Sequence, residues 1–141
     1  MQTVFGRAIV HFVAAAIALV WVGLFAGAAV SGQGKNASDG VYTAAQADRG
    51  QKTYEETCAP CHETSQFTSN DFFANWGGKP LFELFDKVKT TMPEDNPGTL
   101  KPQQYADLIA YYLKLNEFAA GQTELKGDAE ALKGVTLDKK K

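Results

Sequence analysis

The chain has 141 residues but few of the types that form cross-links or bind metals: two cysteines, two histidines and two methionines. Two cysteines are too few for a disulfide-rich scaffold. An excess of one charge is also missing, because 14 Lys and Arg stand against 16 Asp and Glu. Without a basic excess to neutralise phosphates, the composition argues against a nucleic-acid-binding protein. The sequence has no internal repeat and no strand-like alternation, so we predict an all-α protein.

Apolar residues are concentrated at the N-terminus. Between Ala8 and Val30, 20 of 23 residues are apolar, and Arg7 is the only charged residue before Lys35. A basic residue, an apolar stretch and small residues at its end are typical of a secretory signal. The stretch is also long enough for an uncleaved membrane anchor through residues 8–30. A buried core helix is disfavoured because the segment has no polar face. Both favoured interpretations place the rest of the chain outside the cytoplasmic membrane, in the periplasm.

The remainder of the chain is much less apolar than the N-terminal segment. From Ser31 to Lys141 only 40 of 111 residues are apolar, which is little for a self-sufficient core. We predict a signal peptide or uncleaved anchor over 1–30 and a flexible linker over 31–41. A domain over 42–120 and a partly docked C-terminal extension over 121–141 follow.

Helix signals recur through the predicted domain. A T-x-x-Q capping box begins a first helix at Thr43, and its Gly50 is suited to close approach of another helix. Three further helices are predicted from caps, prolines and apolar spacing. The first carries Phe72, Phe73 and Trp76 and ends at Gly77-Gly78. The second follows Pro80, and the third extends from Pro102 to about Glu117.

The most specific pattern is Cys58-Ala59-Pro60-Cys61-His62. C-x-x-C-H is the attachment signature of c-type haem. Two thiols three positions apart can reach two vinyl groups of one porphyrin, and the adjacent histidine then reaches the iron. Zinc binding and dithiol redox chemistry are the alternatives. A zinc site would need further protein ligands, but the other histidine is His11 in the N-terminal segment. A dithiol redox site is expected in a βαβ context, which the sequence does not have.

Met92 is the only methionine after the N-terminal segment, and it lies in Thr91-Met92-Pro93. The proline keeps the residue before it extended. Haem iron in electron-transfer proteins is often held by a histidine and a methionine, so Met92 is the candidate second axial ligand beside His62. The alternative is a methionine that fills the core. With both axial positions occupied, electron transfer is favoured over catalysis.

These segments together resemble class I (monohaem) bacterial cytochromes c over residues 43–120. The resemblance rests, in order, on Gly50-x-x-x-Tyr54, Cys58-x-x-Cys61-His62, Thr91-Met92-Pro93 and Leu108-Ile109-Ala110-Tyr111. It implies a small fold of short helices around one covalently attached haem c. It also implies that the first and last helices cross, with Gly50 and Tyr54 meeting Leu108 and Tyr111.

The sequence departs from the mitochondrial pattern after His62. There a Gly-Pro supplies a carbonyl to the histidine ring N–H, whereas here no proline follows before Pro80. A hydrogen-bond acceptor for the ring is still expected, but the sequence does not identify it. Trp76 is either a donor to a haem propionate, as in relatives, or a buried aromatic with another partner. Seven other aromatics are assigned to haem packing or core: Tyr54, Phe67, Phe72, Phe73, Phe82, Phe85 and Tyr112.

Two functions compete on this basis. One is a monohaem carrier that passes single electrons between redox proteins such as a dehydrogenase, a bc1-type complex or a terminal oxidase. The other is a dedicated cytochrome subunit of a periplasmic dehydrogenase or respiratory complex. A ligand sensor or peroxidase would require Met92 to leave the iron. Lysines near Met92 form either a basic rim that steers acidic partners or an ordinary solvated charge mixture: Lys79, Lys87, Lys89 and Lys101.

Overall fold

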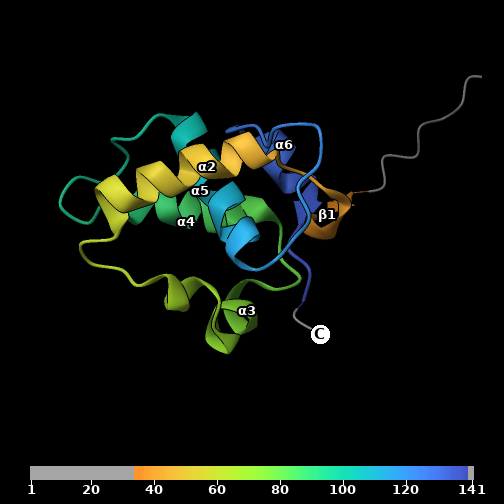
Figure 1. Cartoon of the computed structure of the whole chain (residues 1–141), viewed down its shortest axis with the longest axis horizontal. Coiled ribbons are helices and arrows are strands. Elements are labelled where there is room, and N and C mark those ends of the chain that lie inside the picture. The colour runs from red at the N-terminus through yellow and green to blue at the C-terminus, as the bar shows by residue number, and fades with distance from the viewer. Residues whose placement is uncertain (1–33, 140–141) are drawn as a thin grey trace, which may run out of the picture. The chain divides into compact units, whose positions relative to one another are not determined.

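Helices follow one another along most of the chain in the computed structural model, which describes residues 34–139 (Figure 1). The elements are, in chain order, β1 (Lys35–Asn36), η1 (Ala37–Asp39), α2 (Ala44–Thr53), η2 (Tyr54–Cys58), η3 (Thr64–Phe67), α3 (Asn70–Trp76), α4 (Leu81–Thr91), α5 (Pro102–Leu115), α6 (Ala129–Lys133) and β2 (Val135–Thr136). The sequence predicts an all-α fold, and this part of the chain is mostly helical, with one pair of two-residue strands in addition. The segment predicted to be a signal or anchor, residues 8–30, lies outside the described residues.

The described helices are all too short or too polar to cross a membrane. They begin where the sequence places capping residues. The Thr43 hydroxyl accepts the Gln46 N–H at 3.1 Å at the start of α2, and the Ser69 hydroxyl accepts the Phe72 N–H at 3.1 Å at the start of α3. Pro102 occupies the first turn of α5, where its missing N–H has no cost.

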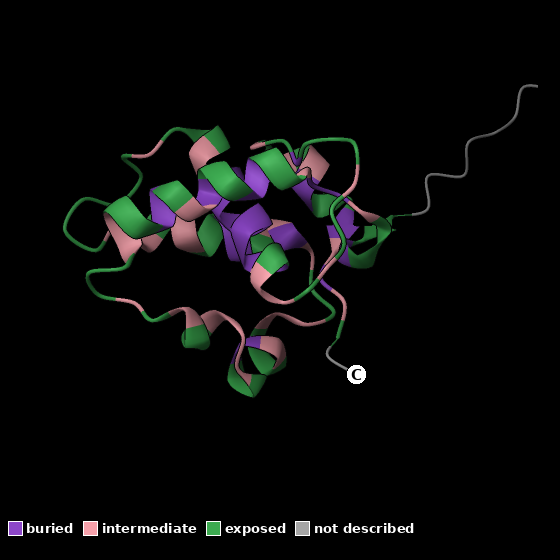
Figure 2. Cartoon of the chain, viewed as in Figure 1, coloured by how far each residue is buried: buried purple, intermediate pink, exposed green. Residues whose placement is uncertain are grey.

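The core centres on α5, which packs against both α2 and α4, and Figure 2 shows buried residues concentrated in the middle of the fold. α2 crosses α5 at Gly50. A Cβ built on Gly50 would lie only 1.9 Å from the Asp107 carbonyl oxygen and 3.0 Å from the Tyr111 Cβ. The aromatic rings of Tyr54 and Tyr111 pack beside this crossing, with centroids 5.4 Å apart. The predicted close approach at Gly50 is therefore present, with Asp107 and Tyr111 as the nearest residues.

The first described residues differ from the predicted linker. β1 pairs in parallel with β2, with Lys35 opposite Val135, and η1 follows it directly. Ala37 is fully buried and Val41 is nearly so. Residues 35–41 are therefore part of the folded unit. A two-residue strand and a single buried alanine leave no periodic pattern in the sequence, so this part of the fold is not predictable from it.

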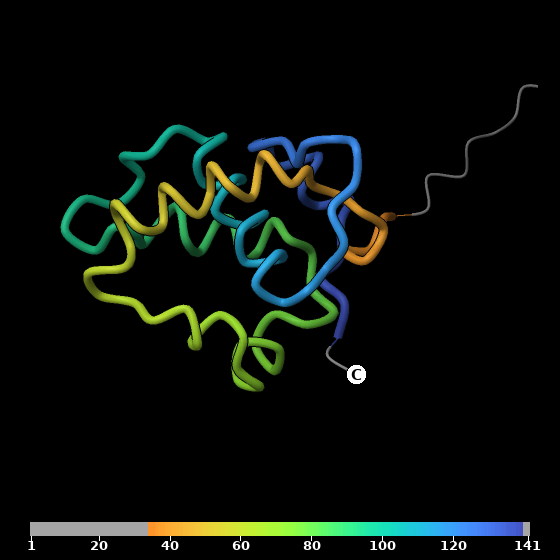
Figure 3. Tube along the Cα trace, viewed as in Figure 1, coloured from red at the N-terminus to blue at the C-terminus, as the bar shows by residue number. Residues whose placement is uncertain are grey.

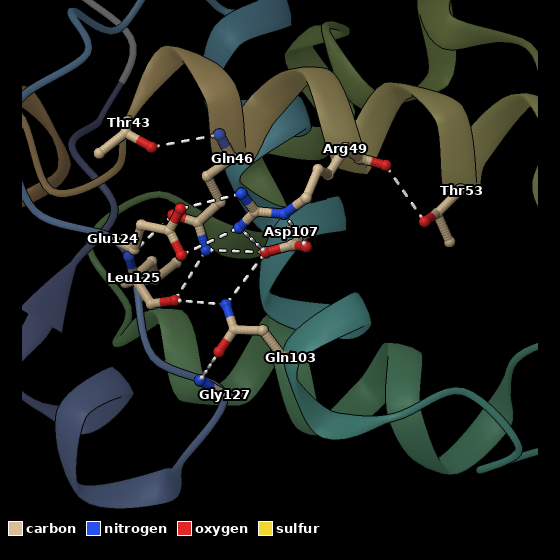
Figure 4. Close-up of polar contacts among 9 residues, drawn as sticks. All are labelled: Thr43, Gln46, Arg49, Thr53, Gln103, Asp107, Glu124, Leu125 and Gly127. Atoms are coloured by element: carbon tan, nitrogen blue, oxygen red, sulfur yellow. Dashed lines mark hydrogen bonds and ion pairs between the residues drawn. The ribbon is translucent and has the colours of Figure 1, made fainter.

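The C-terminal extension packs against the same core, and Leu125, Leu132 and Leu137 are all buried. Figure 4 shows the polar contacts that hold its first part. Gln46 Nε2 donates to the Leu125 carbonyl at 2.7 Å and to Asp107 Oδ1 at 3.0 Å. The extension is thus bound to both α2 and α5.

The chain between α2 and α4 bows away from these helices (Figure 3). It contains η3 and α3. Phe72 of α3 is buried, whereas most other residues of the segment are exposed. α4 then returns the chain to the core through its buried Leu81, Leu84 and Phe85. This bowed segment and the core provide the two sides of the site.

Candidate functional site

A cavity of about 1400 Å³ lies between the bowed segment and the core. All four predicted site residues line this central cavity, and they come from two separate parts of the chain. Cys58 ends η2, with Cys61 and His62 in the turn that follows, and Met92 lies at the end of α4. The fold therefore brings two thiols, an imidazole and a thioether to one cavity. That donor set fits a covalently attached haem.

A tight turn places the cysteines and the histidine. η2 is a single π-helical turn that continues α2 and ends at Cys58. The Cys58 carbonyl then accepts the Cys61 N–H at 3.1 Å and the His62 N–H at 3.0 Å. Cys58 and Cys61 form no disulfide with each other. Burial raises the pKa of the half-buried Cys58 thiol, whereas Cys61, which also lines the cavity, is exposed.

Two hydrogen bonds hold His62, one at its imidazole and one at its backbone carbonyl. Its Nδ1 lies 2.9 Å from the side-chain oxygen Oε1 of Gln66, one turn further along the chain. With that oxygen as acceptor, Nδ1 carries the proton and Nε2 keeps the lone pair that a metal needs. The Tyr54 hydroxyl donates to the His62 backbone carbonyl. The acceptor that the sequence leaves open is thus the Gln66 side chain, and because His62 lies in a turn between η2 and η3, no helical spacing signals this contact.

Met92 lies in the extended conformation that the sequence predicts, with φ −127° and ψ 148°. Its N–H donates to the Val88 carbonyl at 2.9 Å, which is the last helical bond of α4. Its carbonyl accepts the Tyr105 hydroxyl at 2.9 Å and the Gly98 N–H at 3.4 Å. The backbone of Met92 is therefore held on both sides, while its side chain lines the central cavity.

Aromatic rings form one wall of the cavity. Phe67 stacks on Tyr112 with centroids 4.2 Å apart and planes within 7° of parallel. Both rings line the cavity together with Phe72, whereas Tyr54 and Phe85 are buried in the core beside it. Burial raises the pKa of Tyr112 far above its ordinary value, and the nearby Cys58 thiol adds to this shift. Tyr112 thus stays neutral, and the wall is an apolar surface.

The rim of the cavity carries charges of both signs. Of the four lysines considered for a basic rim, only Lys87 lines the cavity, beside the acidic Asp71, Glu94 and Asp95. The structure thus gives a mixed rim and no basic patch. Trp76 also lines the cavity, and the Lys79 ammonium lies 5.5 Å from the centroid of its ring.

A zinc site finds no support in the described part of the chain. Residues 34–139 contain no group of three or more His, Cys, Asp and Glu side chains that could hold a metal ion. The cysteines and the histidine therefore lack the further ligands that tetrahedral zinc requires. The haem interpretation uses both thiols, the imidazole and the thioether that line the cavity.

Residues 45–111 match a family model described as cytochrome C oxidase, cbb3-type, subunit III. The matched segment extends from α2 into α5 and includes Cys58, Cys61, His62 and Met92. No curated protein and no solved structure matches the chain.

Proposed function

Because the chain belongs to the c-type cytochrome family, we propose that it is a monohaem carrier of single electrons whose iron is held by His62 and Met92. The family implies covalently bound haem c, and the sequence contains one C-x-x-C-H motif, which supports one haem. The observation that carries the proposal is that both thiols, the imidazole and the thioether line one cavity.

The haem, when bound, supplies an iron that alternates between Fe(III) and Fe(II) and so accepts and releases one electron. Cys58 and Cys61 would hold it through thioether bonds. Gln66 keeps the Nε2 lone pair of His62 available by accepting the Nδ1 proton. A methionine thioether is a neutral ligand that raises the reduction potential. Two protein ligands leave no iron position for a substrate, which favours a carrier over an enzyme.

A second function is favoured by the family description, which names a subunit of a respiratory oxidase. In that case the chain is a dedicated cytochrome subunit that passes electrons within a respiratory complex. Both functions use the same central cavity and differ in how permanently the partner is bound. A transient carrier buries a small interface and a permanent subunit a large one. The apolar N-terminal segment supports a site of action outside the cytoplasmic membrane for either function.

Covalent attachment and one-electron chemistry are tested together. The Cys58→Ser, Cys61→Ser double variant should lose all haem that survives denaturation and separation on a gel. Ser65→Ala, a change at another residue that lines the cavity, should keep it. Redox titration of the wild-type protein should follow a one-electron Nernst curve. Covalent haem in the double variant, or a titration that requires two electrons, would contradict the proposal.

The choice between carrier and subunit has its own test. The native protein is extracted from membrane and soluble fractions and purified through a high-salt wash. A free carrier should elute without a redox partner, because small polar interfaces dissociate under these conditions. Stoichiometric co-purification of an oxidase or a dehydrogenase would establish the subunit function.

A further inference from the structure

Tyr105 links the proposed ligand Met92 to the longest helix of the described chain. Its hydroxyl donates to the Met92 carbonyl oxygen at 2.9 Å. Tyr105 lies in the first turns of α5, whereas Met92 ends α4, so the bond connects two helices across the cavity wall. The contact therefore fixes one backbone atom of Met92 relative to the core.

The position of the Tyr105 hydroxyl is itself set by packing. The residue is fully buried, and its ring meets the ring of Phe85 edge-on, with centroids 6.2 Å apart and an interplanar angle of 80°. A ring held between α4 and α5 has little rotational freedom. Its hydroxyl is therefore a fixed donor in the free protein and needs no rearrangement to reach Met92.

The chain after Met92 makes hydrogen bonds within its own loop: the Asn96 N–H donates to the Pro93 carbonyl at 3.0 Å and the Thr99 hydroxyl donates to the Asn96 carbonyl at 2.9 Å. Residues 94–99 are all exposed, and the Gly98 N–H reaches the Met92 carbonyl only at 3.4 Å. On the other side, α4 holds the Met92 N–H. Because the carbonyl and the side chain share one Cα, holding the carbonyl limits where the thioether can move. Of the two hydrogen bonds that the Met92 carbonyl accepts, the one from Tyr105 is the shorter, and its donor belongs to the buried core.

We propose that the Tyr105 hydroxyl is a positioning group that keeps the Met92 thioether directed into the central cavity and on the iron. This inference rests on the proposed function, because it takes Met92 as an axial ligand. Removing the hydroxyl raises the fraction of molecules in which Met92 has left the iron. An external ligand binds that fraction, so its observed affinity rises in proportion.

Tyr42 provides a matched control. It is also buried, and its hydroxyl also donates to a backbone carbonyl, that of Phe118, at 2.6 Å. Tyr42 does not line the central cavity. Tyr105→Phe and Tyr42→Phe each remove one buried hydroxyl and one hydrogen bond to a carbonyl. Only the first removes a contact to Met92.

The experiment uses the full-length haem-loaded protein in the ferric state, with imidazole as the external ligand and the Soret band as the signal. Tyr105→Phe should bind imidazole roughly three- to tenfold more tightly than wild type, the range expected for the loss of one hydrogen bond. Tyr42→Phe should bind imidazole like wild type. Urea unfolding of both variants should show similar losses of stability, so a general weakening of the fold cannot explain the difference.

Equal imidazole affinities in Tyr105→Phe and Tyr42→Phe would overturn the positioning proposal. Met92→Ala separates this failure from failure of the ligand assignment. If Met92→Ala binds imidazole more tightly than wild type while Tyr105→Phe does not, Met92 is the ligand and only the role of Tyr105 is wrong. If Met92→Ala binds imidazole like wild type, Met92 is not the ligand and both proposals fail.

Discussion

Replacing Gly50 by alanine tests the helix crossing that positions the site. The new Cβ would lie 1.9 Å from the Asp107 carbonyl oxygen and 2.5 Å from the Asp107 carbonyl carbon. Both are backbone atoms of α5, so no side-chain rotation can relieve the overlap. α2 and α5 must move apart, and the Tyr54 and Tyr111 rings beside the crossing lose contact.

The expected magnitude follows from two opposing effects. Overpacking a well-packed contact costs about 1–3 kcal/mol, and a clash with backbone belongs at the upper end of this range. Alanine in place of glycine inside a helix returns about 1 kcal/mol. We therefore expect Gly50→Ala to lower the free energy of unfolding by about 2 kcal/mol. With a urea m-value of about 1–3 kcal/mol/M, the midpoint should fall by roughly 1 M.

The assay is urea unfolding of the haem-loaded protein, followed by circular dichroism and by the Soret band. Gly134→Ala is the matched control, because its Cβ would meet no atom closer than 3.5 Å. Its φ of −77° is also available to alanine. Gly134→Ala should change stability by less than about 0.5 kcal/mol. A Gly50→Ala protein that unfolds at the same urea concentration as wild type would refute the close contact between α2 and α5.

Two further predictions concern side chains near the site. Gln66→Leu removes the acceptor of the His62 Nδ1 proton and makes the imidazole a weaker ligand to the iron, so the reduction potential should rise. Gln66→Glu should lower the potential. Unchanged potentials in both variants would exclude the contact between Gln66 and His62. Arg49→Met removes the charged partner of the buried Asp107 carboxylate, 3.0 Å away, and leaves it the amide donors of Gln46 and Gln103, so the fold should lose about 1–3 kcal/mol in urea unfolding. The matched change Lys133→Met breaks an exposed pair and should cost less than about 1 kcal/mol, and equal effects would contradict the role given to Asp107.

Much of the site is predictable because its signals are local in sequence. The thiol spacing of Cys58 and Cys61, the adjacent His62 and the single Met92 before a proline are all short patterns. The structure places these four residues around one cavity, and their binding of a haem stays a prediction. The same holds for Gly50, whose close-approach role follows from a glycine inside an amphipathic helix.

Other parts of the structure depend on contacts between distant residues. β1 and β2 pair residues 100 positions apart, Lys35 with Val135, and neither strand has a pattern of its own. The bond between Tyr105 and Met92 likewise joins two helices, and a tyrosine on an apolar face indicates burial without identifying the partner of its hydroxyl. Such contacts depend on the packed fold and cannot be read from periodicity or capping residues.

The most direct test of the central claim is the optical spectrum of the ferric haem-loaded protein in the region of the methionine–iron charge-transfer band. Wild type should show this band, Met92→Ala should lack it, and the Met92→Ala protein should keep its haem covalently bound through Cys58 and Cys61. A wild-type spectrum without the band, or a band that persists in Met92→Ala, would contradict the account of this cavity as a haem site ligated by His62 and Met92.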